Sequence, residues 1–320
     1  MARTCPSNTY PFHKNHPTVS TTMQSTQQVS PIIYESSDYG DSEETMDESM
    51  SNAESPNESD EDITTYTWRD DDDGSIMKNH SIFLPRDVRA IIVGKSGSGK
   101  TTLLNSLLLK PDVMDYDKLM VCGKSLHQPG YRIMQLGFDR GWSKNQVRKL
   151  FQKQKYVSKC GGIDEVLSGV TKCKGGVDAS FFDDVTMIPD PSEHDPSQRN
   201  LLVLDDVMLS PQNKVEAYFT RGRHNNVDVI YITQSYFRLP RQTIRENGNL
   251  FIFFQQDRKN LTHIFNDHCS GDGIPFQTFC DFCNAVWRED RHNFVTIDLT
   301  RTVDNGKYRK NLKDGWLPYK

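Results

Sequence analysis

Short apolar runs alternate along the chain with stretches of helical spacing. Residues 88–93 form an apolar run that ends at a glycine turn, which is typical of a buried central strand. The leucines that follow keep helical spacing up to Pro111, at Leu103, Leu104, Leu107 and Leu108. Further apolar runs lie at residues 119–122, 201–204, 227–232 and 250–254, with helical stretches around residues 144–156 and 212–219. This alternation predicts an α/β fold with a mostly parallel sheet of about five strands.

Two segments depart from this alternation. Residues 161–200 are rich in Gly, Asp and Pro and show little periodicity, which predicts an insertion or a long ordered loop. Residues 1–74 hold sixteen carboxylates against three fixed cations, a net charge of about −13, whereas residues 75–320 carry about +8. A segment of like charge with few apolar residues cannot bury enough surface to offset its ordering entropy. We therefore expect residues 1–80 to be a disordered acidic arm rich in Ser and Thr.

Membrane and secreted classes are disfavoured by composition. The longest uninterrupted apolar runs, such as residues 250–254, hold about five residues, whereas a bilayer span needs roughly twenty. No secretory signal is visible in the first thirty residues. The seven cysteines are odd in number and unequally spaced, which suits a reducing compartment. We expect a protein of the cytoplasm, the nucleus or the interior of a virion, without a membrane partner.

A phosphate-binding loop follows the first apolar run. The motif is Gly94, Lys95, Ser96, Gly97, Ser98, Gly99, Lys100 and Thr101, with Thr102 after it, and it lies between a predicted strand and a predicted helix. Glycines at these positions let backbone amides turn inward as an anion site at the positive end of the helix. Lys100 would contact the β- and γ-phosphates of ATP, and the Thr101 hydroxyl would bind Mg²⁺. The alternative, a glycine-rich turn without a ligand, fits this motif and context poorly.

Two carboxylates end the apolar run at residues 201–204. Asp205 would hold Mg²⁺ through water, as expected at the end of a Walker B strand. Asp206 would polarise the attacking water, or else cap the next helix. Gln234, which ends the next strand, would sense the γ-phosphate or orient the water, or else be a surface residue that caps the strand. Together these residues describe an ATPase of the additional-strand type, with residues 81–320 as its domain.

The chain resembles a known family at several segments. The segments that carry the resemblance are residues 200–206, 218–224, 230–237, 239–240, 244–247 and 316–318. At these segments the sequence is similar to the genome-packaging ATPases of large eukaryotic DNA viruses and Maverick/Polinton elements, within the FtsK–HerA superfamily. The resemblance runs from about residue 85 to residue 318 and leaves the acidic arm uncovered. It implies a RecA-like ATPase that forms a homo-oligomeric ring and pumps double-stranded DNA into a capsid, with capsid proteins as partners.

Ring motors of this kind complete each site with an arginine from the neighbouring subunit. Arg223 is our first candidate for this arginine finger, and Arg221 and Arg245 are the others. The alternatives are contact with DNA phosphates or a plain surface ion pair. A basic helix is the candidate DNA contact, although a solvated helix face explains it equally well. Its cations are Lys144, Arg148, Lys149, Lys153, Lys155 and Lys159.

Other functions fit parts of the sequence. Cys269, Cys280 and Cys283 could bind a metal, but cysteines three residues apart on a helix usually pack in the core. A P-loop kinase of small molecules would use Arg221 and Arg223 as lid residues, although the paired acids and Gln234 argue against it. A nucleotide-dependent assembly scaffold with weak ATPase activity is the third possibility. Stimulation of ATP turnover by duplex DNA would separate the three classes.

Overall fold

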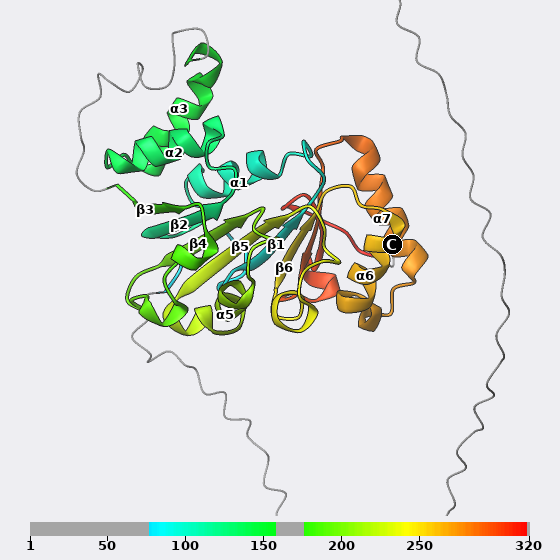
Figure 1. Ribbon diagram of the computed structural model, residues 1–320. Helices are drawn as coiled ribbons and strands as arrows, with labels where there is room; N and C mark the ends of the chain where they lie inside the picture. Colours follow the sequence, from blue (N-terminus) through cyan, green and yellow to red (C-terminus); the bar gives the residue numbers. More distant parts are fainter. Residues whose placement is uncertain (1–76, 158–175, 319–320) are drawn as a thin grey trace, which may run out of the picture. The chain divides into compact units, whose positions relative to one another are not determined.

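The computed structural model describes residues 77–157 and 176–318, and the side chains of residues 152–157 are outside that description. The predicted acidic arm therefore lies outside the described residues, except for residues 77–80, and the boundary near residue 80 stays a prediction. Within the described residues, the fold is built on a nine-stranded sheet in the order β3-β2-β4-β5-β1-β6-β7-β8-β9 (Figure 1). No helix in these two ranges is long and apolar enough to cross a membrane.

Six neighbouring strands of the sheet are parallel. They are β3 (Asp178–Phe182), β2 (Lys118–Gly123), β4 (Asn200–Asp205), β5 (Val227–Thr233), β1 (Arg89–Val93) and β6 (Leu250–Phe253). β5 pairs with β4 on one side and with β1 on the other, so one strand separates the predicted Walker A and Walker B strands. This order confirms the additional-strand type and the mostly parallel α/β sheet.

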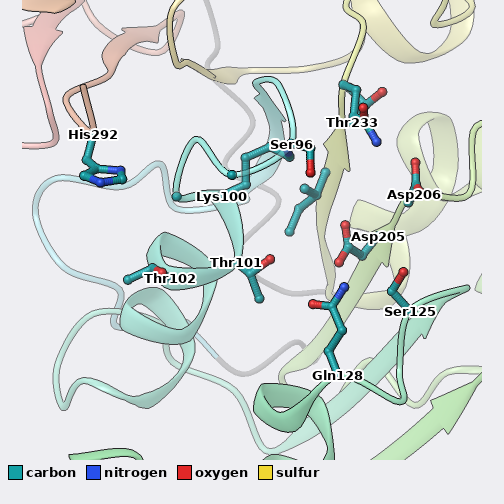
Figure 2. Close-up of a pocket in the computed structure, with 14 residues that line it drawn as sticks. Ser96, Lys100, Thr101, Thr102, Ser125, Gln128, Asp205, Asp206, Thr233 and His292 are labelled. Atoms are coloured by element: carbon teal, nitrogen blue, oxygen red, sulfur yellow. The ribbon is translucent and has the colours of Figure 1, made fainter. Parts of the chain in front are cut away.

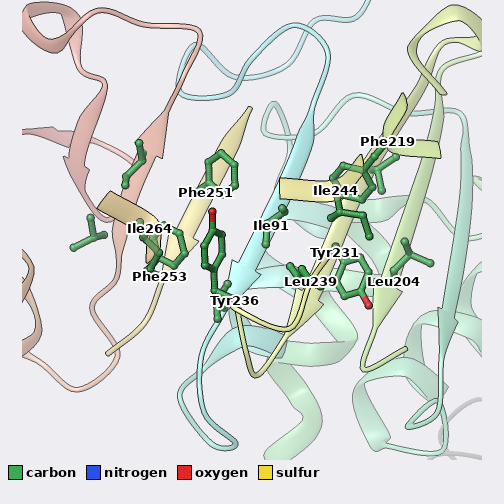
Figure 3. Close-up of a cluster of buried hydrophobic side chains, with 14 of the residues drawn as sticks. Ile91, Leu204, Phe219, Tyr231, Tyr236, Leu239, Ile244, Phe251, Phe253 and Ile264 are labelled. Carbon is green, nitrogen blue, oxygen red and sulfur yellow. The ribbon is translucent and has the colours of Figure 1, made fainter. Parts of the chain in front are cut away.

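Helices cover both faces of the parallel strands. α1 (Lys100–Leu109), α2 (Pro129–Asp139) and α3 (Lys144–Val157) pack on one face, where Ile92, Val203 and Ile230 point. α5 (Asn213–Arg221), α6 (Arg258–His268) and α7 (Phe276–Glu289) pack on the other face (Figure 1). Figure 3 shows side chains of this second core, among them Ile91 and Tyr231. Because both faces are covered, neighbouring residues of a strand are all buried and read as continuous apolar runs.

The sheet is larger than the five strands expected from the sequence. The expected strands are β1, β2, β4, β5 and β6, and all five are confirmed. β3 lies within the segment predicted as an insertion or loop, so that prediction is wrong for Asp178–Phe182. The antiparallel strands β7 (Val295–Asp298), β8 (Tyr308–Lys310) and β9 (Asp314–Gly315) extend the sheet beyond β6. Residues 161–175 of the predicted segment lie outside the described residues, and the residues between β3 and β4 hold only the short 3-10 helices Val185–Met187 and Pro191–Glu193.

A buried ionic cluster closes the amino ends of the central strands. Asp228 of β5 is 1% exposed and accepts hydrogen bonds from the Lys78 ammonium at 3.0 Å and from the Val88 backbone N–H at 2.7 Å. His80 Nε2 lies 3.0 Å from its other carboxylate oxygen. Lys78 also contacts Asp87 at 3.3 Å. The segment before β1 is therefore fixed at the edge of the sheet opposite the phosphate-binding loop.

Candidate nucleotide-binding site

The loop between β1 and α1 has the backbone geometry of an anion site. Gly97 and Gly99 have φ angles of 74° and 109°, which side-chain-bearing residues rarely adopt, and α1 begins directly after Gly99. At Gly94 a Cβ atom would lie 2.5 Å from Ser98 Oγ and 2.9 Å from Phe254 Cβ, so only glycine fits. The Gly94 N–H donates to the Thr233 carbonyl at 3.1 Å, which ties the loop to the end of β5.

A pocket of about 450 Å³ opens over this loop (Figure 2). Its size falls in the range of small-molecule sites, roughly 300–1,000 Å³. The lining comes from the loop, α1, the β2–α2 turn, the ends of β4 and β5, and the α7–β7 loop. The residues are Ser96, Gly97, Gly99, Lys100, Thr101, Thr102, Ser125, Gln128, Asp205, Asp206, Ile232, Thr233, Gln234 and His292. Gly94, Lys95 and Ser98 complete the loop behind this lining.

Lys100 is held inside the loop. Its ammonium donates to the Gly94 carbonyl at 2.6 Å and to the Lys95 carbonyl at 2.9 Å. Burial lowers the pKa of Lys100, and the nearby carboxylates of Asp205 and Asp206 oppose this shift. The ammonium is thus placed among backbone groups of the anion site, where a triphosphate would replace the loop carbonyls as its partner.

Asp205 ends β4 at the pocket. Burial raises the pKa of its carboxyl group and the neighbouring Asp206 raises it further, whereas a hydrogen bond from Tyr131 and the charge of Lys100 lower it. The Tyr131 hydroxyl donates to Asp205 Oδ2 at 2.5 Å, and burial raises the pKa of Tyr131, so this hydroxyl keeps its proton. At Gly123 a Cβ atom would lie 2.8 Å from the Asp205 carbonyl oxygen. Tyr131 of α2 therefore positions the carboxylate, and Gly123 of β2 lies close against the backbone of the same residue.

Asp206 and Gln234 lie at the ends of neighbouring strands. Asp206 has a φ angle of 57°, and its N–H donates to the Ile232 carbonyl of β5 at 3.2 Å. The next helix, α5, begins at Asn213 with Gln212 as its N-cap residue, so the helix-capping alternative for Asp206 is wrong. Asp206 and Gln234 are exposed side chains that both line the pocket. An acid and an amide thus face the same space from β4 and β5.

The three candidate finger arginines have different surroundings. Arg223 is exposed in the 3-10 helix Gly222–Asn225, at the amino end of β5. The seven residues of β5 separate it from the pocket by roughly 20 Å. Arg221 is exposed at the end of α5. Arg245 is buried, and its guanidinium donates to Asp267 at 2.8 Å, so it is committed to an internal ion pair.

The basic helix predicted as a DNA contact is α3. Val147 and Leu150 are buried as the amphipathic pattern predicts. Lys144 is not a free surface cation, because its ammonium donates to the Met114 carbonyl at 3.1 Å and lies 3.5 Å above the Tyr116 ring. Burial lowers the pKa of Lys144 to about 8. Arg148 donates to Asn145 at 2.9 Å. Lys149 is exposed, while Lys153, Lys155 and Lys159 lie outside the described side chains.

The candidate metal-binding cysteines lie in the core. Cys280 and Cys283 are on the buried face of α7, and Cys269 follows α6. Burial raises the pKa of Cys269 to about 12 and raises that of Cys283 as well, which disfavours the thiolate that binds metals. Among the residues that the structure describes, no group of three or more His, Cys, Asp or Glu side chains could hold a metal ion.

Six residues at the site were not predicted as site residues, namely Ser125, Gln128, Tyr131, Ile232, Thr233 and His292. Ser125 and Gln128 precede α2 and line the pocket. Tyr131 contacts Asp205 from 74 positions away, and His292 Nδ1 lies 3.1 Å from the Ser98 carbonyl from 194 positions away. The residues after β2 carry one usable signal, since loops at the carboxyl ends of parallel strands form ligand sites. Nothing local to His292 indicates its place.

The fold and the loop geometry define the class: the chain has a P-loop NTPase fold of the additional-strand type. No model of a known protein family matches the sequence, and no curated protein sequence matches it either. Among solved structures, the chain is similar to the genome-packaging NTPase B204 of Sulfolobus turreted icosahedral virus 2 in complex with sulfate. Identity is 13% and the TM-score 0.42, over 72% of this chain and 98% of that one.

Two further B204 structures are similar to the chain at comparably low identity. The complex of the virus 2 protein with ATP-gammaS has 11% identity and a TM-score of 0.39, over 72% of this chain and 98% of that one. B204, the DNA-packaging ATPase of Sulfolobus turreted icosahedral virus, has 14% identity and a TM-score of 0.36, with the same coverage. At this distance the function has to be inferred from the residues of the site.

Proposed function

We propose that this chain is an Mg²⁺-dependent ATP hydrolase that moves double-stranded DNA, without sequence preference, into a capsid. The observation that carries the hydrolase is one pocket that combines Lys100 with Asp206 and Gln234 from the neighbouring strands β4 and β5. A cation inside an anion loop suits the phosphates of ATP. An exposed carboxylate and an amide across from that cation suit a water molecule that attacks the terminal phosphate.

The residues fit the ligands that this reaction requires. The pocket volume suits a nucleotide, and Asp205 and Thr101 offer the oxygen ligands that Mg²⁺ prefers. When bound, Mg²⁺ would neutralise charge on the β- and γ-phosphates. Lys100 would leave the carbonyls of Gly94 and Lys95 and hold the same phosphates. Asp206 would accept a proton from the water, and Gln234 would orient it. Residues 94–102 would surround the phosphates.

The motor function rests on different support. The resemblance to genome-packaging ATPases implies a homo-oligomeric ring, duplex DNA and capsid proteins as partners. Arg223 lies roughly 20 Å from its own pocket, since β5 lies between them, and cannot serve it. This distance supports Arg223 as a finger for a neighbouring subunit. Arg245 is withdrawn as a finger because Asp267 holds it in the interior. Residues 81–320 would form the motor domain and residues 1–80 the acidic arm, except that Lys78 and His80 at the end of the predicted arm pack against Asp228 of the domain.

The test is ATP turnover by the purified, nuclease-treated chain, with and without duplex DNA. Lys100→Ala should abolish turnover, whereas Asp206→Asn should lower it by about 10²-fold or more and leave ATP binding largely intact. Duplex DNA should raise wild-type turnover. Wild-type turnover in Lys100→Ala would refute the hydrolase assignment. ATP turnover that duplex DNA does not change would indicate an assembly scaffold with ATPase activity. Phosphoryl transfer to a small molecule would indicate a kinase.

Arg223 requires a separate test with mixed oligomers. Asp206→Asn alone and Arg223→Ala alone should both be nearly inactive. After subunit exchange, mixtures should regain turnover, since some interfaces would pair an intact Asp206 with an intact Arg223. Mixtures that stay inactive would indicate that Arg223 contacts DNA and completes no nucleotide site, which would leave Arg221 as the finger candidate.

A further inference from the structure

An exposed aromatic side chain follows the strand that carries Gln234. Phe237 is 47% exposed although it is a large apolar residue. Its ring stacks on the His263 ring of α6, with centroids 5.3 Å apart and an interplanar angle of 23°. The Lys259 ammonium lies 4.9 Å from the centre of the Phe237 ring. Contacts with His263 and Lys259 thus hold the Phe237 ring in place at the surface.

The same short segment joins this ring to the nucleotide pocket. Gln234 lines the pocket and Phe237 is three positions later. Between them, Tyr236 is buried; its hydroxyl donates to Asp267 at 2.8 Å and lies 2.7 Å from His268 Nε2. The Arg245 guanidinium lies 5.0 Å from the Tyr236 ring. Tyr236 therefore fixes the direction in which the chain leaves the pocket and the place at which Phe237 reaches the surface.

Basic side chains lie close to the exposed ring. The Lys259 ammonium lies over it, the His263 ring stacks on it, and Arg238 is exposed at the next position in the chain. Asp257, two positions before Lys259, is engaged as the N-cap of α6, where it accepts from the Asn260 N–H at 2.8 Å. We name the group of Phe237, Arg238, Lys259 and His263 the aromatic–basic patch.

We propose that the aromatic–basic patch contacts the sugar–phosphate backbone of duplex DNA. The inference rests on the proposed function and adds the surface through which the nucleotide site communicates with DNA. Two long cationic side chains suit phosphates without reading sequence, and the flat apolar ring of Phe237 suits a deoxyribose face. Gln234 and Phe237 are three positions apart, so DNA on the patch would lie close to the strand end that lines the nucleotide pocket.

The experiment compares single variants of the full chain. Lys259→Gln and Phe237→Ala test the patch, and Lys259→Arg keeps the charge. Lys313→Gln is the matched control, because Lys313 is also exposed and lies 5.6 Å from the ring of an aromatic residue, Phe83, outside the patch. For each variant we would measure duplex affinity by fluorescence anisotropy over a salt series, ATP turnover with and without duplex, and particle size by sedimentation velocity.

Lys259→Gln should weaken duplex binding by about tenfold at low salt and lower the salt slope by about one. Phe237→Ala should weaken binding similarly with an unchanged salt slope, since no charge is removed. Both should lose most DNA stimulation at a fixed DNA concentration, while Lys259→Arg and Lys313→Gln keep it. Lys259→Gln that behaves as Lys313→Gln would overturn the inference. Smaller particles with unchanged affinity per chain would also overturn it and assign the patch to a subunit interface. A wild-type chain without DNA stimulation would refute the proposed function itself.

Discussion

Asp228 is the residue whose replacement should destabilise the fold most clearly without touching the nucleotide pocket. In Asp228→Asn the side chain keeps its size and can still accept the Val88 N–H, but the buried Lys78 ammonium loses its charged partner at 3.0 Å. Removing one partner of a buried ion pair costs about 3–5 kcal/mol. Asp87 stays 3.3 Å from Lys78 and is half exposed, so we expect a loss near about 3 kcal/mol, the lower end of that range.

A loss of this size is a large share of a typical folding free energy of about 5–15 kcal/mol. For a domain of this size it should lower the melting temperature by about 6–12 °C. Urea unfolding followed by tryptophan fluorescence measures the change directly. Asp304→Asn is the control, because Asp304 is exposed and its replacement should cost less than about 0.5 kcal/mol.

The cause of the loss can be separated from its size. If an uncompensated buried charge is responsible, Lys78→Met in the Asp228→Asn background should recover part of the stability, since the remaining ammonium is removed. ATP affinity should stay near the wild-type value in every folded variant, because the cluster lies at the sheet edge opposite the pocket. Equal stability of Asp228→Asn and Asp304→Asn, or no recovery in the double variant, would refute this reasoning.

Three further predictions concern the pocket. Gly123→Ala places a Cβ atom 2.8 Å from the Asp205 carbonyl and should lower ATP turnover by tenfold or more, measured against Gly315→Ala, which meets nothing within 4 Å. Because burial raises the pKa of Asp205, Mg²⁺-dependent turnover should fall on acidification at a higher pH than for an ordinary carboxylate. Tyr131→Phe removes a bond that lowers this pKa and should move the acidic limb to still higher pH; an unmoved limb would exclude Asp205 as the titrating group. His292→Ala should weaken the binding of ATP but not the binding of tripolyphosphate, each measured by its competition for the pocket. His292 lies across Lys100 from Asp205 and Asp206, on the side toward which the nucleoside of ATP would extend (Figure 2). Equal losses of affinity for the two ligands would contradict this reasoning.

The predictable parts of the fold are those in which consecutive residues are buried and therefore apolar. β1, β4 and β5 are covered on both faces, so nearly all their residues are apolar and each strand is visible without knowledge of its neighbours. The phosphate-binding loop was predictable because its geometry depends on glycines within eight positions. In both cases the information is local.

The parts that were missed depend on distant partners. β3 pairs only with β2 among the described strands, and its side chains are half-buried or exposed, so it lacks a continuous apolar run. In β7, Asp298 is fully buried, which is tolerated because Arg309 and Arg301 donate to it at 3.1 and 3.0 Å. Such pairing turns a polar residue into a core residue, and no local pattern indicates it.

In the proposed motor, strand β5 would connect the nucleotide sites of two neighbouring subunits. All seven residues of this strand are buried, and it pairs with β4 and β1 along its length, so it behaves as a rigid element. Its carboxyl end leads to Gln234 in its own pocket, and its amino end follows Arg223. In the proposed ring, one strand would therefore report on its own nucleotide at one end and on a neighbour's nucleotide at the other. A small displacement of β5 would move both Gln234 and Arg223, because a strand packed on both faces moves as a unit and does not bend.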